Sequence, residues 1–422
     1  MIPIQKIRAH KEELAIKLKK KNFSNLHLLD EILTLDDNRK STQRLLDELL
    51  AQSNQLSKQI PILMKDGKKE EAETLKIESA NLKSATQAYA DEMRALEKLI
   101  LDLHAQIPNI PHDKVGYGKS AEDNTTVRTG GEIPNLIDGA LPHWELTKKY
   151  DIIDFDLGVK LTGAGFPVYK GKGAKLERAL IQYFLDKATE AGYLEIIPPL
   201  MVNEESAFAT GQLPDKEGQM YQNHDGFYMI PTAEVPVTNI YRDTVSAESD
   251  LPIKLTAYSQ CFRREAGSYG KDVRGLNRLH QFDKVEIVQL VQPDTSYDTL
   301  ETMTSHVESL LIELGLPYRV LLLCGGDMSF ASAFTYDLEV YSAAQEKWLE
   351  VSSVSNFEDF QANRLKARFK NGEGKIELCH TLNGSALALP RIVAALLENN
   401  QTEKGIRIPQ VLVPYTKFEY ID

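Results

Sequence analysis

The sequence predicts an α+β protein, in which an N-terminal antiparallel coiled-coil helical hairpin precedes a mainly antiparallel β-sheet flanked by helices. Two observations carry this prediction. The first hundred or so residues contain two heptad seams separated by a short polar break. Beyond residue 108 the pattern changes to short β-rich runs broken by glycine and proline, with a few helices between them. The 422 residues are enough for two or three domains with a sizeable core.

The first seam begins at Leu28 and alternates spacings of four and three residues. A polar break at 64–69, centred on Gly67, separates it from a second seam that begins at Leu75. Each helix has about 35 residues, so the hairpin reaches roughly 50 Å. On periodicity alone, a dimerisation or scaffold coiled coil is an equal alternative. The seam positions are Leu28, Ile32, Leu35, Arg39, Thr42, Leu46, Leu49, Ser53, Leu56, Ile60 and Leu63, then Leu75, Ser79, Leu82, Thr86, Tyr89, Met93, Leu96, Ile100 and Leu103.

Pro108 and Pro111 end the second helix, because neither can continue it. We therefore expect a helical domain at 1–107, a linker at 108–120 and a second domain at 121–422. The absence of a regular βαβ repeat in the second domain favours an antiparallel sheet. Its expected helices are 173–191, 294–314 and 390–400, and its expected strands are 253–264, 281–291, 336–341 and 347–352.

The composition is that of an ordinary globular protein, with 42% hydrophobic and 26% charged residues. Cys261, Cys324 and Cys379 are far apart, which indicates a reducing compartment. The N-terminus has no apolar signal-peptide core, and no apolar run is long enough for a bilayer. We expect a cytoplasmic protein with no membrane partner. The net charge of −12 argues against coating nucleic acid by bulk electrostatics and alone favours an acidic metabolic enzyme, although a local basic surface can still bind a nucleic acid.

The densest chemical signal lies at 261–286, which reads as a strand, a glycine-punctuated basic loop and a returning strand. Alternation along a strand places Arg263 and Glu265 on one face, and Phe282 and Glu286 on one face. If these faces coincide, the site holds a guanidinium, two carboxylates and an aromatic ring. Such a set suits a nucleotide and a small zwitterion. A charged surface hairpin with a solvated loop is the alternative.

This segment resembles motif 2 of the class II aminoacyl-tRNA synthetases, in the form specific to seryl-tRNA synthetases. Pro-Thr-Ala-Glu-Val-Pro at 231–236 is similar to the family's serine-binding segment, and 350–361 to its ATP–Mg²⁺ segment. The stretch 381–391 resembles motif 3. The segments 165–169 and 195–199, with a helix between them, resemble the dimer-forming motif 1, and the N-terminal hairpin resembles the family's tRNA-gripping arm. The resemblance covers essentially the whole chain, with the motifs in family order.

The resemblance implies an ATP site with two catalytic arginines. Arg263 is expected to bind the α-phosphate and Arg391 to lie near adenine and the γ-phosphate, while Phe282 stacks on the base and Glu265 faces its amino group. Glu350 and Ser353 are expected to hold Mg²⁺ through oxygen ligands. The full set expected at ATP is Arg263, Arg264, Glu265, Phe282, Glu350, Val351, Ser352, Ser353 and Arg391.

It also implies a serine site. Thr232 and Glu234, with Ala233 between them, are expected to receive the α-ammonium group, and Glu286 and Ser385 to read the hydroxyl. Polar groups that need a hydroxyl partner would be left buried and unpaired with alanine, which explains selectivity for serine. Because the serine carboxylate attacks ATP directly, no protein nucleophile is needed. We therefore expect structural roles for His280, Cys379 and His380.

The implied activity is that of a serine–tRNA ligase. Serine and ATP give seryl-adenylate and pyrophosphate, and serine then passes to the 3′ end of tRNA(Ser) and, by the same route, of tRNA(Sec). Motif 1 implies a homodimer. Two departures affect acceptor-end contacts and motif 3: Tyr269 and Lys271 in the motif 2 loop, and Ala-Leu-Ala-Leu-Pro-Arg at 386–391. Two alternatives remain: an amino acid ligase acting on a carrier protein, and a non-enzymatic paralogue that binds through its coiled coil.

Overall fold

The computed structural model describes residues 1–215, 217–265 and 274–422. Tyr269 and Lys271 lie outside the described residues. The chain separates into two compact units, one of residues 2–16 and 23–108, the other of Met1, 17–22 and 109–422. No helix in the described part of the chain is long and apolar enough to cross a membrane.

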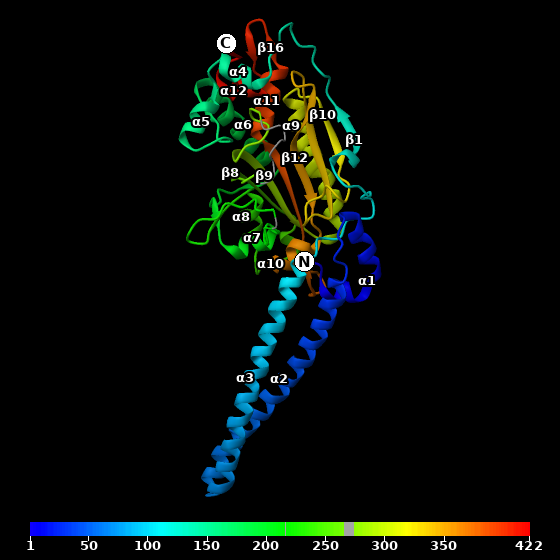
Figure 1. Cartoon of the computed structure of the whole chain (residues 1–422), viewed down its shortest axis with the longest axis vertical. Coiled ribbons are helices and arrows are strands. Elements are labelled where there is room, and N and C mark those ends of the chain that lie inside the picture. The colour runs from blue at the N-terminus through cyan, green and yellow to red at the C-terminus, as the bar shows by residue number, and fades with distance from the viewer. Residues whose placement is uncertain (216, 266–273) are drawn as a thin grey trace. The chain divides into compact units, whose positions relative to one another are not determined.

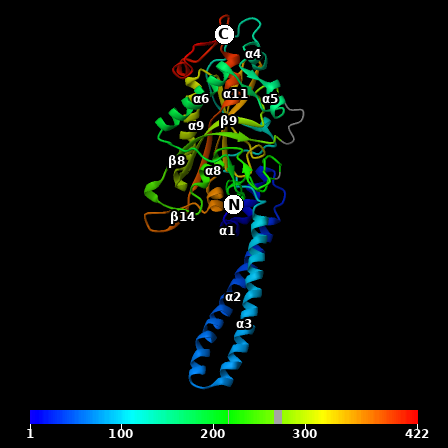
Figure 2. The ribbon, with the colours of Figure 1, turned by 90° about the vertical axis from the view of Figure 1, so that its left-hand side faces the viewer.

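The first unit is dominated by two antiparallel helices, α2 (Leu28–Lys65) and α3 (Lys69–His104), which form a hairpin (Figures 1 and 2). The least exposed residues of both helices follow the predicted heptad seams, and Ile32, Met93 and Ile100 are buried there. A polar pair crosses the seam, since the Thr42 hydroxyl donates to Glu92 Oε1 at 3.2 Å. The coiled-coil hairpin predicted from the sequence is confirmed.

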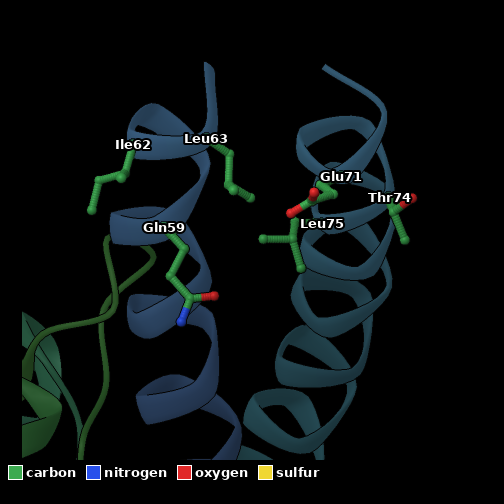
Figure 3. Close-up of a pocket in the computed structure, with 6 residues that line it drawn as sticks. All are labelled: Gln59, Ile62, Leu63, Glu71, Thr74 and Leu75. Atoms are coloured by element: carbon green, nitrogen blue, oxygen red, sulfur yellow. The ribbon is translucent and has the colours of Figure 1, made fainter. Parts of the chain in front are cut away.

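The seam loosens near the tip of this hairpin. There the two helices line a pocket of about 490 Å³ (Figure 3). Leu63 and Leu75 point toward each other across it, whereas Ile62 points away and is 59% exposed. The tip is therefore held by fewer apolar contacts than the base. The pocket is lined by Gln59, Ile62, Leu63, Glu71, Thr74 and Leu75.

The base of the hairpin carries a buried acid. Asp36 on α2 is 3% exposed and accepts from Arg8 of α1 (Ile4–Leu18) at 2.9 Å, while Arg39 and Lys40 lie 2.9 and 2.6 Å from it. Burial raises the pKa of Asp36, but the hydrogen bonds from the three cations outweigh it and lower the pKa to about 2. This cluster ties α1 to α2.

The second unit is built on an eight-stranded sheet with the order β1-β10-β11-β12-β15-β9-β8-β4. Every neighbouring pair is antiparallel except β4 and β8, so the predicted mainly antiparallel sheet is confirmed. The strands in that order are β1 (Thr125–Gly130), β10 (Tyr318–Leu322), β11 (Phe334–Ser342), β12 (Lys347–Asn356), β15 (His380–Ala388), β9 (Gln281–Val291), β8 (Ile253–Phe262) and β4 (Leu194–Glu195).

Helices cover both faces of this sheet. The long helices α6 (Gly171–Glu190), α9 (Ser296–Glu313) and α11 (Leu389–Asn399) share one apolar core with Val285 and Ile287 of β9. Val288 and Leu290 pack in a second cluster with residues of α8 (Glu234–Asn239) and α10 (Asp359–Leu365). Because side chains alternate along a strand, these two clusters mark opposite faces of the sheet. The face toward α8 and α10 carries the candidate site.

Smaller elements surround the sheet. The remaining helices are α4 (His143–Lys149), α5 (Phe155–Leu161), α7 (Glu204–Thr210) and α12 (Val413–Thr416). The remaining strands form small sheets: β2 (Ile153–Asp154) with β3 (Val168–Tyr169), β5 (Met201–Val202) with β6 (Tyr228–Met229), β7 (Val245–Ala247) with β13 (Arg368–Lys370) and β14 (Ile376–Leu378), and β16 (Gln401–Thr402) with β17 (Gly405–Arg407) and β18 (Tyr420–Ile421).

One predicted strand is too long. β8 ends at Phe262, two residues before the expected end at Arg264. Glu265 has φ +50°, in the left-handed region, so the chain there no longer alternates as a strand. Strand alternation therefore does not apply to Arg263 and Glu265, and the prediction that β8 continues to Arg264 was wrong.

Candidate active site

Strand β9 supplies one row of the candidate site. Lys284 and Glu286 alternate with the core residues Val285 and Ile287 and so share the face toward α8. Phe282 stands two residues before Lys284 in the same alternation and also packs against the core cluster. The Lys284 ammonium lies 2.5 Å from Glu286 Oε2, and both side chains are almost fully buried. On the neighbouring strand β15, Ser385 stands opposite Glu286 in the ladder, and the Asn383 amide donates to Glu286 Oε1 at 3.2 Å.

The segment that leads into α8 completes this polar cluster. The Thr232 hydroxyl donates to Glu286 Oε2 at 3.1 Å and accepts from Lys284 Nζ at 2.9 Å. Its oxygen also accepts from the backbone N–H of Glu234 at 3.2 Å, which fixes the start of the helix. The structure thus brings together four of the expected serine-site residues, Thr232, Glu234, Glu286 and Ser385. The fifth, Ala233, turns its side chain into the apolar core.

Glu234 is held from behind by α10. Gln361 donates to Glu234 Oε1 at 2.7 Å, and its own oxygen accepts from the Thr381 hydroxyl at 2.7 Å. Burial, and then the charge of Glu286, raises the pKa of Glu234 to about 7. A cationic ligand would compensate the buried negative charge of the Glu234 carboxylate, so the site favours an ammonium group.

Lys284 was missed by the sequence prediction. Its position two residues from both Phe282 and Glu286 in one strand was a usable signal, because residues i and i+2 share a face. The lysine compensates the buried charge of Glu286, which would otherwise be costly to bury. Gln361 was also missed, and its role depends on contacts across more than a hundred residues of chain.

A cation and an aromatic ring lie beside this cluster. The Arg263 guanidinium carbon is 5.2 Å from the centre of the Phe282 ring, within cation–π range. Its Nε donates to the carbonyl of Pro231 at 3.4 Å. His280 secures the backbone of Arg263, since its carbonyl accepts from the Arg263 N–H and its Nδ1 lies 2.9 Å from the Arg263 carbonyl oxygen. Arg263 and Phe282 are thus brought together as predicted, and His280 has a structural contact.

Glu265 and Arg264 contact residues outside the cluster around Glu286. Glu265 pairs with Arg278, and Arg264 is exposed, with its backbone N–H bonded to the carbonyl of Gln219. The two residues follow the end of β8, so the sheet does not fix their direction.

A bulge in β12 aligns Glu350 with Ser353. Leu338 of β11 pairs with Ser352 and Glu339 with Glu350, so Val351 is the extra residue. Without the bulge, residues three apart would point to opposite faces. The side chain of Val351 lies in the apolar core, and the Ser352 hydroxyl donates to the backbone carbonyl of Ser385 at 2.5 Å. Of this segment, Glu350 and Ser353 therefore present their side chains to the site face, and Val351 and Ser352 do not.

Asp337 joins Glu350 and Ser353 on that face. It stands opposite Ser353 in the ladder and shares a hydrogen bond with that hydroxyl. Burial, and then the charge of Glu350, raises the pKa of Asp337 well above its ordinary value, and its Oδ1 is buried without a hydrogen-bond partner. An orphaned buried carboxylate oxygen beside a second carboxylate fits a divalent cation. Among the described residues no three His, Cys, Asp or Glu side chains form a closed metal cluster.

Arg391 closes the site from the first turn of α11. Its Nε donates to the carbonyl of Asn277 at 3.0 Å and one terminal nitrogen donates to the carbonyl of Glu350 at 2.7 Å. That nitrogen also lies 3.7 Å from Glu350 Oε2. Arg391 therefore lies beside Glu350 of β12, while Arg263 follows the end of β8, on the other side of the β9–β15 pair.

An antiparallel sheet that carries this set of arginines, carboxylates and a phenylalanine on one face is the core of a class II aminoacyl-tRNA synthetase. Residues 218–400 match the tRNA synthetase class II core domain (G, H, P, S and T), and residues 1–111 match the seryl-tRNA synthetase N-terminal domain. The chain belongs to the serine–tRNA ligase family.

Individual relatives agree along the full length. The serine–tRNA ligase of Salinibacter ruber is 50% identical over 424 residues, covering all of this chain and 99% of that protein. That of Prosthecochloris aestuarii is 45% identical over 428 residues, covering all of this chain and 99% of its own. The structure of seryl-tRNA synthetase from Pyrococcus horikoshii complexed with ATP superposes with a TM-score of 0.89, at 32% identity and 99% coverage of both chains.

Proposed function

We propose that the protein activates L-serine with ATP and transfers it to tRNA. In the first step a serine carboxylate oxygen bonds to the α-phosphorus while the bond to pyrophosphate breaks. In the second step the terminal ribose hydroxyl of the tRNA attacks the carbonyl of seryl-adenylate, and AMP leaves. The observation that carries the proposal is the buried cluster of Thr232, Lys284 and Glu286 beside Arg263 and Phe282.

The cluster suits serine in size and polarity. Glu234, with its pKa near 7, would receive the α-ammonium group together with Thr232. Glu286 and Ser385, opposite each other in the ladder, would hold the hydroxyl. Alanine would leave these buried groups without a partner, so discrimination against it is expected to be strong.

Arg263 and Arg391 are the proposed catalytic residues. A guanidinium placed where negative charge builds up on phosphate is usually the largest contribution to such a reaction. Phe282 offers a ring face for adenine. Arg264 and Glu265 are proposed at ATP as well, and Val351 and Ser352 could contribute only their backbone groups there, because their side chains point elsewhere.

Glu350 and Ser353, with Asp337 beside them, would hold Mg²⁺. Bound there, the cation would neutralise phosphate charge and fix the phosphate chain. The raised pKa of Asp337 supports this assignment, because a cation would relieve the repulsion between the two carboxylates.

The N-terminal hairpin is proposed as the tRNA-binding arm, within a domain at 1–107. A rod roughly 50 Å long can reach the extended variable arm of tRNA(Ser) and of tRNA(Sec). The arm is an antiparallel pair of helices with Lys65, Lys68 and Lys69 at its tip.

A homodimer in the cytoplasm is proposed as the working form. The second stretch resembling motif 1, at 195–199, and the residues that flank it expose large apolar side chains: Ile197 is 90% exposed, and the flanking Leu194 and Met201 are 63% and 50% exposed. Exposed apolar side chains gathered in one segment are typical of an interaction surface. The three cysteines are unpaired and buried, which accords with a reducing compartment.

The test is serine transfer to tRNA(Ser) transcripts with and without the variable arm. We expect charging of the intact transcript and much weaker charging of the shortened one. Adenylate formation without transfer to any tRNA would instead favour the ligase that acts on a carrier protein. Failure to form adenylate would favour the non-enzymatic paralogue.

A further inference from the structure

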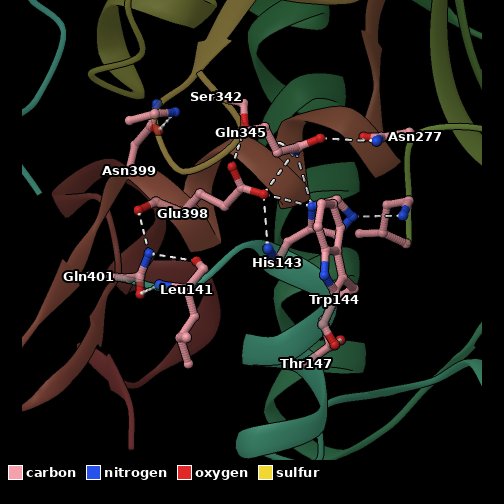
Figure 4. Close-up of polar contacts among 12 residues, drawn as sticks. Leu141, His143, Trp144, Thr147, Asn277, Ser342, Gln345, Glu398, Asn399 and Gln401 are labelled. Atoms are coloured by element: carbon pink, nitrogen blue, oxygen red, sulfur yellow. Dashed lines mark hydrogen bonds and ion pairs between the residues drawn. The ribbon is translucent and has the colours of Figure 1, made fainter. Parts of the chain in front are cut away.

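A buried histidine outside the motifs contacts the segment that follows the motif 2 loop. His143 (Figure 4), the first residue of α4, is fully buried. Its Nε2 accepts a hydrogen bond from the backbone N–H of Leu276 at 2.8 Å. The two residues are 133 positions apart in the chain. None of the proposed ATP or serine contacts involves His143, so its role needs a separate explanation.

The contacts of His143 define its tautomer. Because Leu276 donates to Nε2, that nitrogen carries a lone pair and the proton sits on Nδ1. Nδ1 then donates to Glu398 Oε1 at 2.7 Å, and the backbone N–H of His143 donates to the same oxygen at 2.9 Å. The ring is thus held at both nitrogens and cannot turn without breaking a buried hydrogen bond.

Glu398, near the end of α11, anchors the network. It also accepts from the Ser342 hydroxyl and from the Gln345 amide, the latter at 2.9 Å. Burial raises the pKa of Glu398, but the hydrogen bonds from His143 and Ser342 outweigh burial and lower it. Four donors therefore hold an ionised carboxylate in place behind His143 (Figure 4).

The segment 274–277 is seated against this ring. Gly275 has φ +63°, and a Cβ there would lie 2.1 Å from His143 Nε2, so only glycine allows the backbone to approach so closely. On one side of this contact the Arg274 guanidinium lies 5.1 Å from the centre of the Trp144 ring. On the other, the Asn277 amide donates to Gln345 Oε1 at 3.0 Å.

The backbone carbonyl of Asn277 links the segment 274–277 to Arg391, because it accepts a hydrogen bond from Arg391 Nε at 3.0 Å. Arg391 and Glu398 are seven residues apart on α11, so they lie on the same side of the helix about two turns apart. The helix therefore grips the segment 274–277 at two points, directly through Arg391 and indirectly through Glu398 and His143. A shift of Leu276 would move the carbonyl that orients the Arg391 guanidinium.

We propose that His143 is a positioning residue for ATP: by accepting the Leu276 N–H, it fixes the Asn277 carbonyl that aims Arg391 at the nucleotide. The inference rests on the proposed role of Arg391 at ATP. It assigns a function to a residue that contacts neither substrate. The alternative is that the network only stabilises the fold, in which case its loss would not distinguish ATP from serine.

The test compares two substitutions, one that can replace the hydrogen bond of Nδ1 and one that can replace the hydrogen bond of Nε2. In His143→Asn the amide can still donate to Glu398 but leaves the Leu276 N–H without an acceptor. In His143→Gln the amide oxygen can reach the place of Nε2 and restore that acceptor. The control is His27→Asn, the same change at an exposed histidine that directly precedes α2. Serine-dependent ATP–pyrophosphate exchange gives KM for both substrates, and thermal unfolding reports the fold.

For His143→Asn we expect the KM for ATP to rise about tenfold, while the KM for serine stays within about twofold. His143→Gln should recover most of the ATP affinity. Should His143→Asn not fold, Gln345→Leu breaks the link to the Asn277 side chain and should raise the KM for ATP about threefold. The proposal would be overturned if His143→Asn left the KM for ATP unchanged. It would also be overturned if both histidine variants lost thermal stability equally and kept unchanged KM values.

Arg391→Ala separates this inference from the proposal on which it rests. If Arg391→Ala leaves the KM for ATP unchanged, the role of Arg391 at ATP is wrong. If Arg391→Ala weakens ATP binding but His143→Asn and Gln345→Leu do not, the role of Arg391 stands and the inference about His143 is refuted.

Discussion

Lys284 and Glu286 form a buried ion pair at 2.5 Å in the floor of the candidate serine site, and Thr232 bonds to both. Removing one member of such a pair leaves the other charge buried and uncompensated. Loss of either residue is therefore expected to destabilise the site.

For Lys284→Met we expect the KM for serine to rise at least tenfold and the free energy of unfolding to fall by about 3–5 kcal/mol. Urea unfolding and exchange kinetics measure the two effects. Lys370→Met, at an exposed lysine, should change neither. A Lys284→Met protein with normal serine affinity would show that the ion pair does not shape the pocket.

The affinity for serine should depend on pH through Glu234. Its pKa is raised to about 7 by burial first and by the charge of Glu286 second, while Gln361, Lys284 and Arg263 oppose the shift. The serine ammonium binds the ionised carboxylate, and the ionised fraction falls as pH drops below 7. The KM for serine should therefore rise as pH falls from 8 to 6, and Glu234→Gln should weaken binding and flatten this dependence. A pH-independent KM in the unaltered protein would contradict the role of Glu234.

Arg263→Ala should lower the rate of pyrophosphate exchange by about 100- to 1,000-fold, because the guanidinium stabilises charge that develops on the α-phosphate. Circular dichroism should show an unaltered fold. Arg407→Ala, on an exposed part of β17, serves as the control and should retain full exchange. Substantial exchange by Arg263→Ala would remove this arginine from the mechanism.

Glu350→Gln should raise the Mg²⁺ concentration needed for half-maximal exchange by about tenfold, since one oxygen ligand loses its charge. Asp337→Asn should have a smaller effect in the same direction, because Asp337 stands opposite Ser353 and already shares a hydrogen bond with its hydroxyl. Calorimetric titration of ATP at fixed Mg²⁺ supplies a readout independent of turnover. Unchanged Mg²⁺ dependence in both variants would place the metal elsewhere.

Deletion of residues 28–103 should leave pyrophosphate exchange within about twofold and lower the rate of tRNA charging by roughly 100-fold or more, the equivalent of about 3 kcal/mol of binding free energy. The two reactions are measured on the same preparation, so the exchange reaction controls for folding. Equal charging by the shortened and full-length proteins would refute the role of the hairpin.

Local patterns in the sequence predicted the parts of the structure that local physics determines. The heptad seams predicted α2 and α3, because the 3.5-residue period alone specifies which residues face the partner helix. The limits of β9 were predicted to the residue. From that strand, alternation placed Phe282 and Glu286 on one face.

The remaining features depend on pairing between distant segments. The β12 bulge exists only in relation to β11, so the sequence of β12 could not reveal that Glu350 and Ser353 share a face. The end of β8 before Arg263 is set by where its ladder with β9 stops. The contact of His143 with Leu276 spans 133 residues, and no periodicity points to it.

The most direct test of the account is ATP–pyrophosphate exchange with each of the twenty amino acids in the absence of tRNA. The account predicts exchange with serine alone, which would identify the substrate and establish the first half-reaction together. Exchange driven by a different amino acid, or no exchange with any of them, would contradict it.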